Sequence, residues 1–568
     1  MDHIARSRIL KRLRFVYGED SPRLFEDLEK LLMSYRGRIP ATKTGWSEKD
    51  SFLITYGDSI TGGKNPLSTL HGFLKKNFKE EISFVHLLPF YPYSSDDGFS
   101  VIDYREVRKD LGGWKDVQSM GGDFKLVFDG VINHVSSQSR YLKEYLAGNP
   151  EYADYFISLP PDTDTSSVLR TRNLPLLHDY DSADGKKWLW TTFSRDQVDF
   201  NFSNPKVLLE IVDILLFYAE HGATMIRLDA IPYMWKKLGT SCAHLPETHE
   251  LIKLFRDIFD VAAPHVILLT ETNVPHKENI VYFGNAGDEA QIIYNFSLAP
   301  LILWSVYKQD ATVLSDWASG VKKVSDNTTF LNITATHDGI GVRPTEGILS
   351  VDERMELCEL ARRHGGDITG KRNSDGSISP YELNINYFDA INGPNADESI
   401  DLQIRRFMLS QTIPMSFIGI PGIYIHSLLG SRNWTEGVKQ TGRARTINRE
   451  TLNADRLEAE LGNKESIRAK VAGEYRRLLV IRSKCRAFHP GAPQEVLKLH
   501  PKLFCLRRWT EDGSEELFAL HNITSGEARC QLPDSGREGF RDLIGGKHFS
   551  TGEIAVPAWT ALWLVPAS

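Results

Sequence analysis

The 568-residue sequence predicts an α/β fold: a (β/α)8 barrel, or TIM barrel, with inserted loop subdomains over its mouth and a small antiparallel β domain at the C-terminus. Two observations predict the barrel. Short β-rich runs recur eight times along the chain, and the segments between them are long enough for helices. Several runs end in an ionisable residue, and barrel proteins place their functional groups at the carboxyl ends of their strands.

Residues 1–48 are predicted to form a helical N-terminal extension. Within this segment the apolar side chains follow helical spacing, as at Leu24, Leu28 and Leu32. We find no pattern typical of catalysis or binding in this extension.

The barrel itself is predicted over residues 49–484. Its strand-like runs are nearly continuous in apolar character, which is typical of parallel strands covered on both faces. Two connections, about 136–205 and 343–400, are too long for ordinary barrel loops and are expected to form lid subdomains over the mouth. The eight runs are SFLITYGD from Ser51, SFVHLLPF from Ser83, LVFDGVINH from Leu126, MIRLDA from Met225, VILLTETN from Val266, QIIYNF from Gln291, FLNITATHD from Phe330 and SFIGIPGIYIH from Ser416.

Residues 485–568 are predicted to form the C-terminal β domain. The runs LFCLRRW from Leu503, LFALHNI from Leu517 and TALWLV from Thr560 are short and strand-like. Gly, Asp and Pro separate them, which favours a small antiparallel sheet.

Composition excludes several classes of function. The chain is 41% hydrophobic and 25% charged with a formal net charge of −7, so it offers no broad basic surface for a nucleic acid. No apolar stretch approaches the length of a membrane span, and the charged N-terminus does not look like a signal peptide. Five scattered cysteines form neither a disulfide framework nor a metal-ligand pattern. We therefore expect a cytoplasmic protein whose partners are small molecules.

The candidate catalytic residues belong to four motifs at the ends of predicted strands: DGVINH, RLDA, TETN and THDG. Together they would bring Asp229, Glu271 and Asp338 to one mouth. Cleaving a glycosidic bond with retention requires a carboxylate nucleophile and a carboxylic acid about 5 to 5.5 Å apart, and neighbouring strands can supply that pair. Any one of these carboxylates alone could be a capped turn or an ion pair, but their joint occurrence favours a catalytic site.

On these motifs the sequence resembles the α-amylase superfamily, glycoside hydrolase family 13, over about residues 50–480. The resemblance implies that Asp229 is the nucleophile, that Glu271 is the acid/base and that Asp338 stabilises the transition state. Arg227 would orient Asp229 and keep the pKa of that carboxyl low, because a neighbouring cation favours the charged form. Glu271 must start protonated, so its pKa should be raised.

Further segments resemble the sucrose phosphorylase subgroup of that family: YGDSI, VHLLPFYPYSSDDGFSVIDYREV, RLDAIPYMWKKLGTSC and INRE. This resemblance implies that Asp58 and Arg449 close the far end of a glucose pocket as a salt-bridged pair. His86, Tyr233 and His337 would contact the same sugar. The alternatives are that the two charged residues are unrelated surface groups and that His86 is a core histidine with satisfied hydrogen bonds.

No metal and no cofactor are expected, and inorganic phosphate is expected as a co-substrate. Asn133 is a calcium ligand in many members of the family, yet the sequence shows no recognisable partner ligands for it. A hydrogen-bonding role for Asn133 is therefore the expectation.

Three loop arginines are candidates for binding the phosphate and the acceptor. Arg170 and Arg172 lie in VLRTRNLPLLHDYD of the first long connection, and Arg343 lies in HDGIGVRP at the start of the second. A guanidinium can bind a phosphate or a carboxylate through two parallel hydrogen bonds. The alternative is that these arginines are solvated loop residues.

Several longer segments resemble the glucosylglycerate phosphorylases within the subgroup: SSDDGFSVIDYREV, WLWTTFSRDQVDFNF, TETNVPHKENIVYFG and HSLLGSRNW. The implied activity is transfer of a glucosyl unit from 2-O-α-glucosylglycerate to phosphate through a glucosyl ester on Asp229, giving α-glucose 1-phosphate and D-glycerate. Phosphorolysis of sucrose or sucrose 6'-phosphate, and an α-glucosidase or transglucosidase, stay open as alternatives. A non-catalytic carbohydrate-binding barrel is disfavoured because all three carboxylates are present. The natural acceptor and the oligomeric state stay open.

Overall fold

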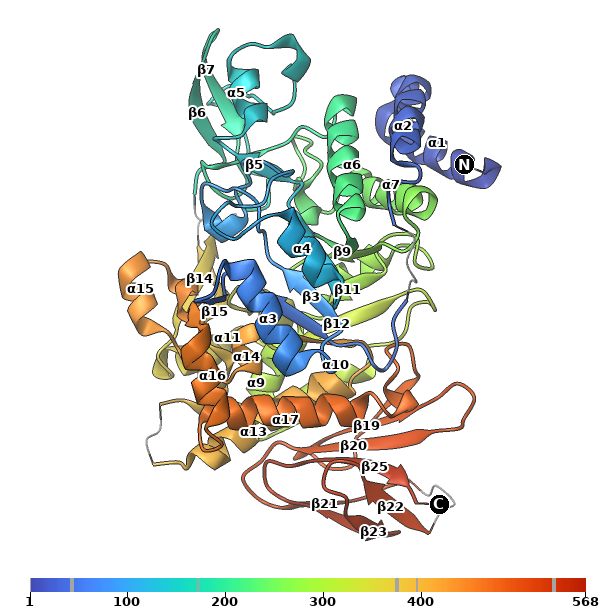
Figure 1. Ribbon diagram of the computed structural model, residues 1–568, viewed down its shortest axis with the longest axis vertical. Helices are drawn as coiled ribbons and strands as arrows, with labels where there is room; N and C mark the ends of the chain where they lie inside the picture. Colours follow the sequence, from blue (N-terminus) through green and yellow to red (C-terminus); the bar gives the residue numbers. More distant parts are fainter. Residues whose placement is uncertain are drawn as a thin grey trace.

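Eight parallel strands form the closed barrel at the centre of the computed structural model, which describes residues 2–40, 45–170, 172, 174–372, 377–394, 397–533 and 538–567 (Figure 1). Each strand pairs with the next along the chain, and the last pairs with the first, as a (β/α)8 barrel requires. Each of the eight predicted runs overlaps a barrel strand, so the predicted barrel is confirmed. The strands are β1 (Phe52–Thr55), β3 (Phe84–Leu87), β4 (Lys125–Gly130), β9 (Ala223–Leu228), β10 (Ile267–Thr270), β11 (Ile292–Tyr294), β12 (Thr329–Ile333) and β16 (Ile420–Tyr424).

Helices in the connections cover the barrel from outside. Their starts follow from local sequence: α6 begins at Pro205, whose missing N–H costs nothing in the first turn, and the Asn204 side chain accepts a hydrogen bond from the backbone N–H of Lys206. None of the described helices is both long and apolar enough to cross a membrane. The main covering helices are α3 (Pro66–Phe78), α4 (Trp114–Gly121), α6 (Pro205–Glu220), α7 (Pro246–Ala262), α9 (Leu298–Lys308), α10 (Thr312–Ser319), α13 (Ile400–Ser416) and α17 (Ile467–Arg482).

The first long connection carries two pairs of antiparallel strands. Its strand β5 pairs with β8 and places Asp199 opposite His134, so the end of the insertion returns to the barrel mouth. Strands β6 and β7 form a second pair that projects from the mouth (Figure 1). The elements are β5 (His134–Ser136), α5 (Arg140–Leu146), β6 (Leu177–Ser182), β7 (Gly185–Trp190) and β8 (Gln197–Asp199).

The second long connection begins with a strand that follows the THDG motif directly. This strand, β13 (Ile340–Gly341), pairs with β15 (Ile378–Asn384), which also pairs with β14 (Asp367–Arg372). The pairing Gly341↔Glu382 holds the β14–β15 hairpin at the mouth. Helices α11 (Val351–Arg363) and α12 (Tyr387–Asn392) flank the hairpin. Shorter elements complete the barrel region: β2 (Ile60–Thr61), α8 (His276–Asn279), α14 (Ile425–Leu428), α15 (Thr435–Thr441), β17 (Leu452–Asn453) and α16 (Ala454–Gly462).

A six-stranded antiparallel sheet and a separate strand pair form the C-terminal part, at the opposite end of the molecule from the N-terminal helices (Figure 1). The three predicted strands here are β19, β20 and β25, so the antiparallel prediction is confirmed. The sheet holds β18 (Gln494–Leu497), β19 (Leu503–Trp509), β20 (Glu516–Asn522), β25 (Ala561–Pro566), β22 (Gly539–Asp542) and β23 (His548–Ser550), and the pair holds β21 (Ala528–Gln531) and β24 (Glu553–Val556).

Two helices, α1 (His3–Tyr17) and α2 (Ser21–Tyr35), pack on the outside of α7 and α6. The apolar seam of α2 is buried, with Leu28 fully covered. Arg12 of α1 lies between acidic side chains of the barrel layer, with Nη1 3.0 Å from Glu250 and Nη2 3.1 Å from Asp288. The extension is therefore attached through both apolar packing and ion pairs.

Two buried arginines bind backbone carbonyls near the junction between the barrel and the C-terminal part. Arg508 of β19 is fully buried and donates to the carbonyls of Ser416 at 2.7 Å and His489 at 2.8 Å. Arg482 of α17 donates in the same way to the carbonyl of Met415 at 2.9 Å. These guanidinium groups satisfy backbone carbonyls at the ends of elements, which would otherwise be buried without donors.

Replacing Arg508 with Met should lower the free energy of unfolding by about 3 kcal/mol, because several buried carbonyls lose their donor at once. The measurement is thermal or denaturant unfolding of the purified variant. Arg529→Met is the matched control, since its side chain is 59% exposed and such surface changes cost little. A variant at Arg508 as stable as the control would contradict the role assigned to this residue.

Candidate active site

The nucleophile and acid/base candidates lie on neighbouring strands. Strands β9 and β10 pair in register with Leu228 opposite Thr270, so Asp229 and Glu271 leave the barrel side by side. Ala230 has a left-handed backbone (φ 50°), and its N–H donates to Glu271 Oε2 at 3.3 Å. The two predicted carboxylates are thus brought together at the mouth.

Arg227, in β9, forms an ion pair with Asp229. Its Nη1 lies 2.9 Å from Asp229 Oδ1 and also donates to Asp129, and the arginine is only 2% exposed. The predicted contact between Arg227 and Asp229 is present. The expectation that Arg227 keeps the pKa of Asp229 low is wrong. Burial raises the pKa of Asp229, and the opposing attraction of Arg227 does not reverse the shift.

The pKa of Glu271 is raised to about 7. Burial is the largest cause, and the negative charges of Asp229 and Asp338 add to it against the opposing effect of Arg227. Asp229 touches the guanidinium directly, whereas Glu271 receives only a backbone N–H. With a pKa of about 7, Glu271 is protonated in a substantial fraction of molecules at neutral pH, which suits a general acid.

Asp338 has the opposite environment. Burial alone would raise its pKa, but Arg445, whose Nη1 lies at 2.6 Å, and Arg449 hold the pKa well below its usual range. His337 is stacked on Phe99 with ring centroids 4.9 Å apart, and burial lowers its pKa to about 3. The site therefore offers an ionised Asp338 beside a neutral histidine.

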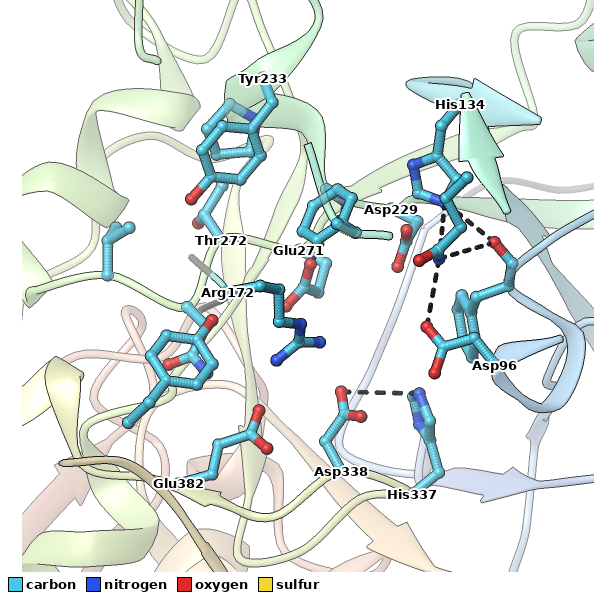
Figure 2. A pocket seen from close by; sticks show the side chains of 18 of the residues that line it. Asp96, His134, Arg172, Asp229, Tyr233, Glu271, Thr272, His337, Asp338 and Glu382 are labelled. Carbon is cyan, nitrogen blue, oxygen red and sulfur yellow. Dashed lines mark hydrogen bonds and ion pairs between the residues drawn. The ribbon is translucent and has the colours of Figure 1, made fainter. Parts of the chain in front are cut away.

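A cavity opens between these groups, lined by carboxylates, arginines and aromatic side chains. Figure 2 shows the carboxylates of Asp229, Glu271 and Asp338 and the guanidinium of Arg172 directed into it. The predicted residues that line the cavity are Arg172, Asp229, Tyr233, Glu271, His337 and Asp338.

Sequence reasoning missed several residues that line the same cavity: Asp96, His134, Glu382 and Arg445. Asp96 belongs to the SDDGF segment, where Asp96, Asp97 and Gly98 all have a left-handed backbone. Such strained conformations in non-glycine residues cluster at functional sites, and an Asp-Asp-Gly sequence after a strand was the available signal. His134 was visible in the DGVINH motif.

Arg445 connects two of the acidic groups. Its Nε and Nη2 donate to Glu382 at 3.0 and 2.6 Å, while Nη1 faces Asp338. Arg445 lies in the 3₁₀ turn Ala444–Asn448, which follows the last barrel strand, and Glu382 comes from β15. The ion pairs therefore attach the β14–β15 hairpin to the mouth.

The predicted salt bridge between Asp58 and Arg449 is wrong. Asp58 is paired with Arg108, and its side chain is 34% exposed. Arg449 donates to the carbonyl of His337 at 2.7 Å and pairs with Asp97. The acidic residue that reaches Arg449 comes from the loop after β3, because that loop and not the one after β1 bends across the mouth.

The prediction that His86 contacts the sugar is also wrong. His86 lies inside β3, is fully buried, and its Nε2 is 2.7 Å from Asp129 Oδ2. Since the cavity lies beyond the strand ends, a residue within the strand cannot line it. His86 instead supports Asp129, which in turn contacts Arg227.

The three predicted anion-binding arginines have different positions. Arg172 lines the cavity, with its guanidinium 5.9 Å from the ring centre of Tyr381. Arg170 lies outside the lining and donates to the carbonyl of Leu174. Arg343 is 7% exposed and sits behind Tyr233, outside the lining. Only Arg172 is placed for direct contact with a ligand in this cavity.

A lysine binds the side-chain oxygen of Asn133 and a neighbouring carboxylate oxygen. Lys236 Nζ lies 3.0 Å from Asn133 Oδ1 and 2.8 Å from Asp199 Oδ2, and the lysine side chain is 4% exposed. Within the described part of the chain, no group of three or more His, Cys, Asp or Glu side chains could hold a metal ion. Asn133 therefore has the hydrogen-bonding environment that was expected for it.

A (β/α)8 barrel with two paired carboxylates at its mouth falls in the class of barrels that act on glycosides by acid–base and nucleophilic catalysis. The family model described as the alpha amylase catalytic domain matches residues 79–339. The chain is 44% identical to the glucosylglycerate phosphorylase of Spirochaeta thermophila over 98% of both chains. It is 45% identical to that of Allomeiothermus silvanus, over 99% of this chain and 98% of the relative.

Among solved structures, the sucrose 6F-phosphate phosphorylase from Thermoanaerobacter thermosaccharolyticum superimposes with a TM-score of 0.73 at 23% identity, covering 92% of this chain and all of that one. The family model and the two near full-length relatives show that the chain belongs to the α-amylase family, glycoside hydrolase family 13.

The raised pKa of Glu271 predicts a pH dependence. Because the acid must be protonated, kcat/KM for an unactivated α-glucoside should fall about tenfold per pH unit above about pH 7. The decline should vanish with a donor such as α-glucosyl fluoride, whose leaving group needs no proton. An identical decline in Glu271→Gln would assign the titration to another group.

Proposed function

We propose that the chain is a retaining disaccharide phosphorylase that transfers a glucosyl unit from 2-O-α-glucosylglycerate to inorganic phosphate. The observation that carries the proposal is that Asp229, Glu271 and a guanidinium, that of Arg172, line one cavity together (Figure 2). The near full-length similarity to glucosylglycerate phosphorylases supports the choice of donor.

The first displacement forms the glucosyl ester. Asp229 attacks the anomeric carbon while Glu271 gives its proton to the glycosidic oxygen, so the C–O bond breaks and D-glycerate leaves. Arg227 fixes the attacking carboxylate, and the pKa of about 7 leaves Glu271 protonated for this step. Asp338, held ionised by Arg445, stabilises the positive charge that develops on the sugar.

The second displacement releases the product. A phosphate oxygen attacks the same carbon, the bond to Asp229 breaks, and Glu271 takes up the proton that phosphate loses. Two inversions restore the configuration, so the product is α-glucose 1-phosphate. Phosphate must approach several carboxylates, and Arg172 offsets their repulsion by offering two parallel hydrogen bonds. Neither step needs a cofactor, because both are nucleophilic displacements with proton transfer.

The glucose end of the cavity is assigned to His134, His337, Asp338, Asp96 and Arg445. All five line it, and the positive charge of Arg445 contributes to keeping the pKa of Asp96 low despite burial. The ionised carboxylates can accept hydrogen bonds from sugar hydroxyls, and the arginine limits the cavity at this end. We place the reaction in the cytoplasm, because all five cysteines are buried and free.

The proposal is tested by incubating the protein with α-glucose 1-phosphate and a panel of acceptors: D-glycerate, fructose, fructose 6-phosphate and glycerol. Phosphate release should be fastest with D-glycerate. Asp229→Asn should be folded and inactive, because an amide of similar size cannot form the ester. Preference for fructose or its phosphate would indicate a sucrose or sucrose 6'-phosphate phosphorylase, and release of free glucose without phosphate dependence would indicate a hydrolase.

Arg172→Ala should raise the KM for phosphate or for D-glycerate by one to two powers of ten, the cost of losing a charged hydrogen bond of about 1.5 to 3 kcal/mol. Initial rates at varied phosphate and glycerate provide the measurement. Arg195→Ala is the control, because Arg195 lies in the same insertion and pairs with Asp179 at the surface. If Arg172→Ala kept the wild-type KM for both phosphate and D-glycerate, the anion-binding role assigned to Arg172 would be wrong.

A further inference from the structure

The loop after β3 carries Asp96 to the cavity on a strained backbone. Asp96, Asp97 and Gly98 stand one after another in the left-handed region, with φ angles of 54°, 51° and 113°. For a residue other than glycine this conformation costs free energy and persists only where the surroundings hold it. Figure 2 shows the Asp96 carboxylate directed into the cavity. Contacts from outside the loop must therefore keep it in this shape.

Asp196 binds both ends of the strained segment. Ser94 and Ser95 precede the segment, and their hydroxyl groups donate to Asp196 Oδ2. Ser100 follows it, is fully buried, and donates to the same oxygen at 2.9 Å and to the Asp196 carbonyl at 2.6 Å. Three hydroxyl groups of one loop thus meet at a single residue that belongs to the first inserted subdomain.

The other carboxylate oxygen attaches Asp196 to its own subdomain. Ser137, directly after β5, donates to Asp196 Oδ1 through its hydroxyl group and through its backbone N–H, the latter at 3.3 Å. Burial would raise the pKa of Asp196, but the hydrogen bonds from the serine hydroxyls lower it below its ordinary value. The carboxylate is therefore ionised, and hydrogen bonds to an ionised acceptor are stronger than those between neutral groups.

The residue after Asp196 contacts the strained segment from inside the cavity. Gln197 Nε2 donates to Asp96 Oδ2 at 3.2 Å and to the carbonyl of Phe99 at 3.2 Å. Gln197 begins β8 and lies opposite Ser136 of β5, so its position is set by the strand pair. Two adjacent residues of the insertion therefore hold the loop, one at its ends and one at Asp96 itself.

We propose that Asp196 is a positioning residue for the glucose end of the cavity. By holding Ser94, Ser95 and Ser100, it keeps the Asp96 carboxylate where a glucose hydroxyl donates to it. Asp196 is absent from the described residues that line the cavity, so it acts only through the loop. The inference rests on the proposed glucosyl transfer and adds a residue that determines which sugar is accepted.

The measured quantity is sugar selectivity. It is kcat/KM for α-glucose 1-phosphate divided by kcat/KM for each analogue that lacks the 2-, 3-, 4- or 6-hydroxyl. Arsenate replaces phosphate as the nucleophile, phosphate is released as the glucosyl ester forms, and water hydrolyses the resulting glucose 1-arsenate. No acceptor takes part, so the selectivity reports on the glucose end alone. Each ratio is independent of the fraction of active protein, so partial misfolding leaves it unchanged.

Asp96→Ala identifies the hydroxyl that Asp96 binds, because the selectivity against the analogue lacking that hydroxyl falls. Asp196→Ala should lower the selectivity against the same analogue about tenfold and leave the other ratios at their wild-type values. In Asp196→Asn the loss should be about threefold or less, because the amide oxygen still accepts and a serine hydroxyl can turn to accept from the amide N–H.

Asp179→Ala is the matched control, since Asp179 is an acidic residue of the same insertion that pairs with Lys186 and Arg195 at the surface. All its ratios should equal those of the wild type.

Ser100→Ala tests the same contact from the loop. It removes one hydroxyl group with little change in volume, and it should lower the selectivity against the same analogue. Combined with Asp196→Ala it should add no further loss, because both changes break one contact. Losses that multiply in the double variant would mean that Ser100 acts independently of Asp196 and would contradict the proposal.

Two failures are distinguishable. If the wild-type protein releases no phosphate from α-glucose 1-phosphate with arsenate, the proposed function fails and the role of Asp196 fails with it. If the wild type is active but Asp196→Ala keeps every ratio, or changes a different ratio from Asp96→Ala, the glucosyl transfer stands and the positioning role is overturned. An equal fall of all four ratios in Asp196→Ala would also overturn it, because a general loosening does not act through Asp96.

Discussion

The site depends on one buried guanidinium. Arg227 lies between Asp129 of β4 and Asp229 after β9, and Asp129 is supported in turn by His86 of β3. Removing one partner of such a buried group costs about 3 to 5 kcal/mol, because a charge is left uncompensated. Three neighbouring barrel strands, β3, β4 and β9, are thus connected by one network of charged side chains. Because the closure of the barrel brings these strands together, it also sets the direction in which the nucleophile Asp229 points.

The different neighbours of the carboxylates separate their roles. Glu271 receives only a backbone N–H and has a pKa of about 7, whereas Asp338 faces Arg445 and has a pKa well below its usual range. Two acids in one cavity therefore differ in protonation because their neighbours differ. Acid–base chemistry and charge stabilisation can then operate at the same pH.

The outer part of the cavity is assembled by ion pairs between loops. Arg445 and Arg449, from the segment after the last barrel strand, bind Glu382 of the lid hairpin and Asp97 of the loop after β3. Asp97 stands in a left-handed segment, a costly conformation that the ion pair to Arg449 helps to hold. The lid sheet also packs Gly341 against Asn273, so one subdomain contacts the cavity lining at both Glu382 and Asn273.

The sequence by itself determined the barrel and the central carboxylates. Strand periodicity shows in local residue order, and in a parallel barrel every strand end faces the same mouth, so Asp229, Glu271 and Asp338 had to meet. It did not determine which loop residues join them. Asp58 and His86 were assigned to the sugar, while Asp96 and Arg445 line the cavity instead. Those choices depend on loop paths and ion pairs between distant segments, which only the tertiary structure fixes, because no short-range periodicity encodes where a long loop ends.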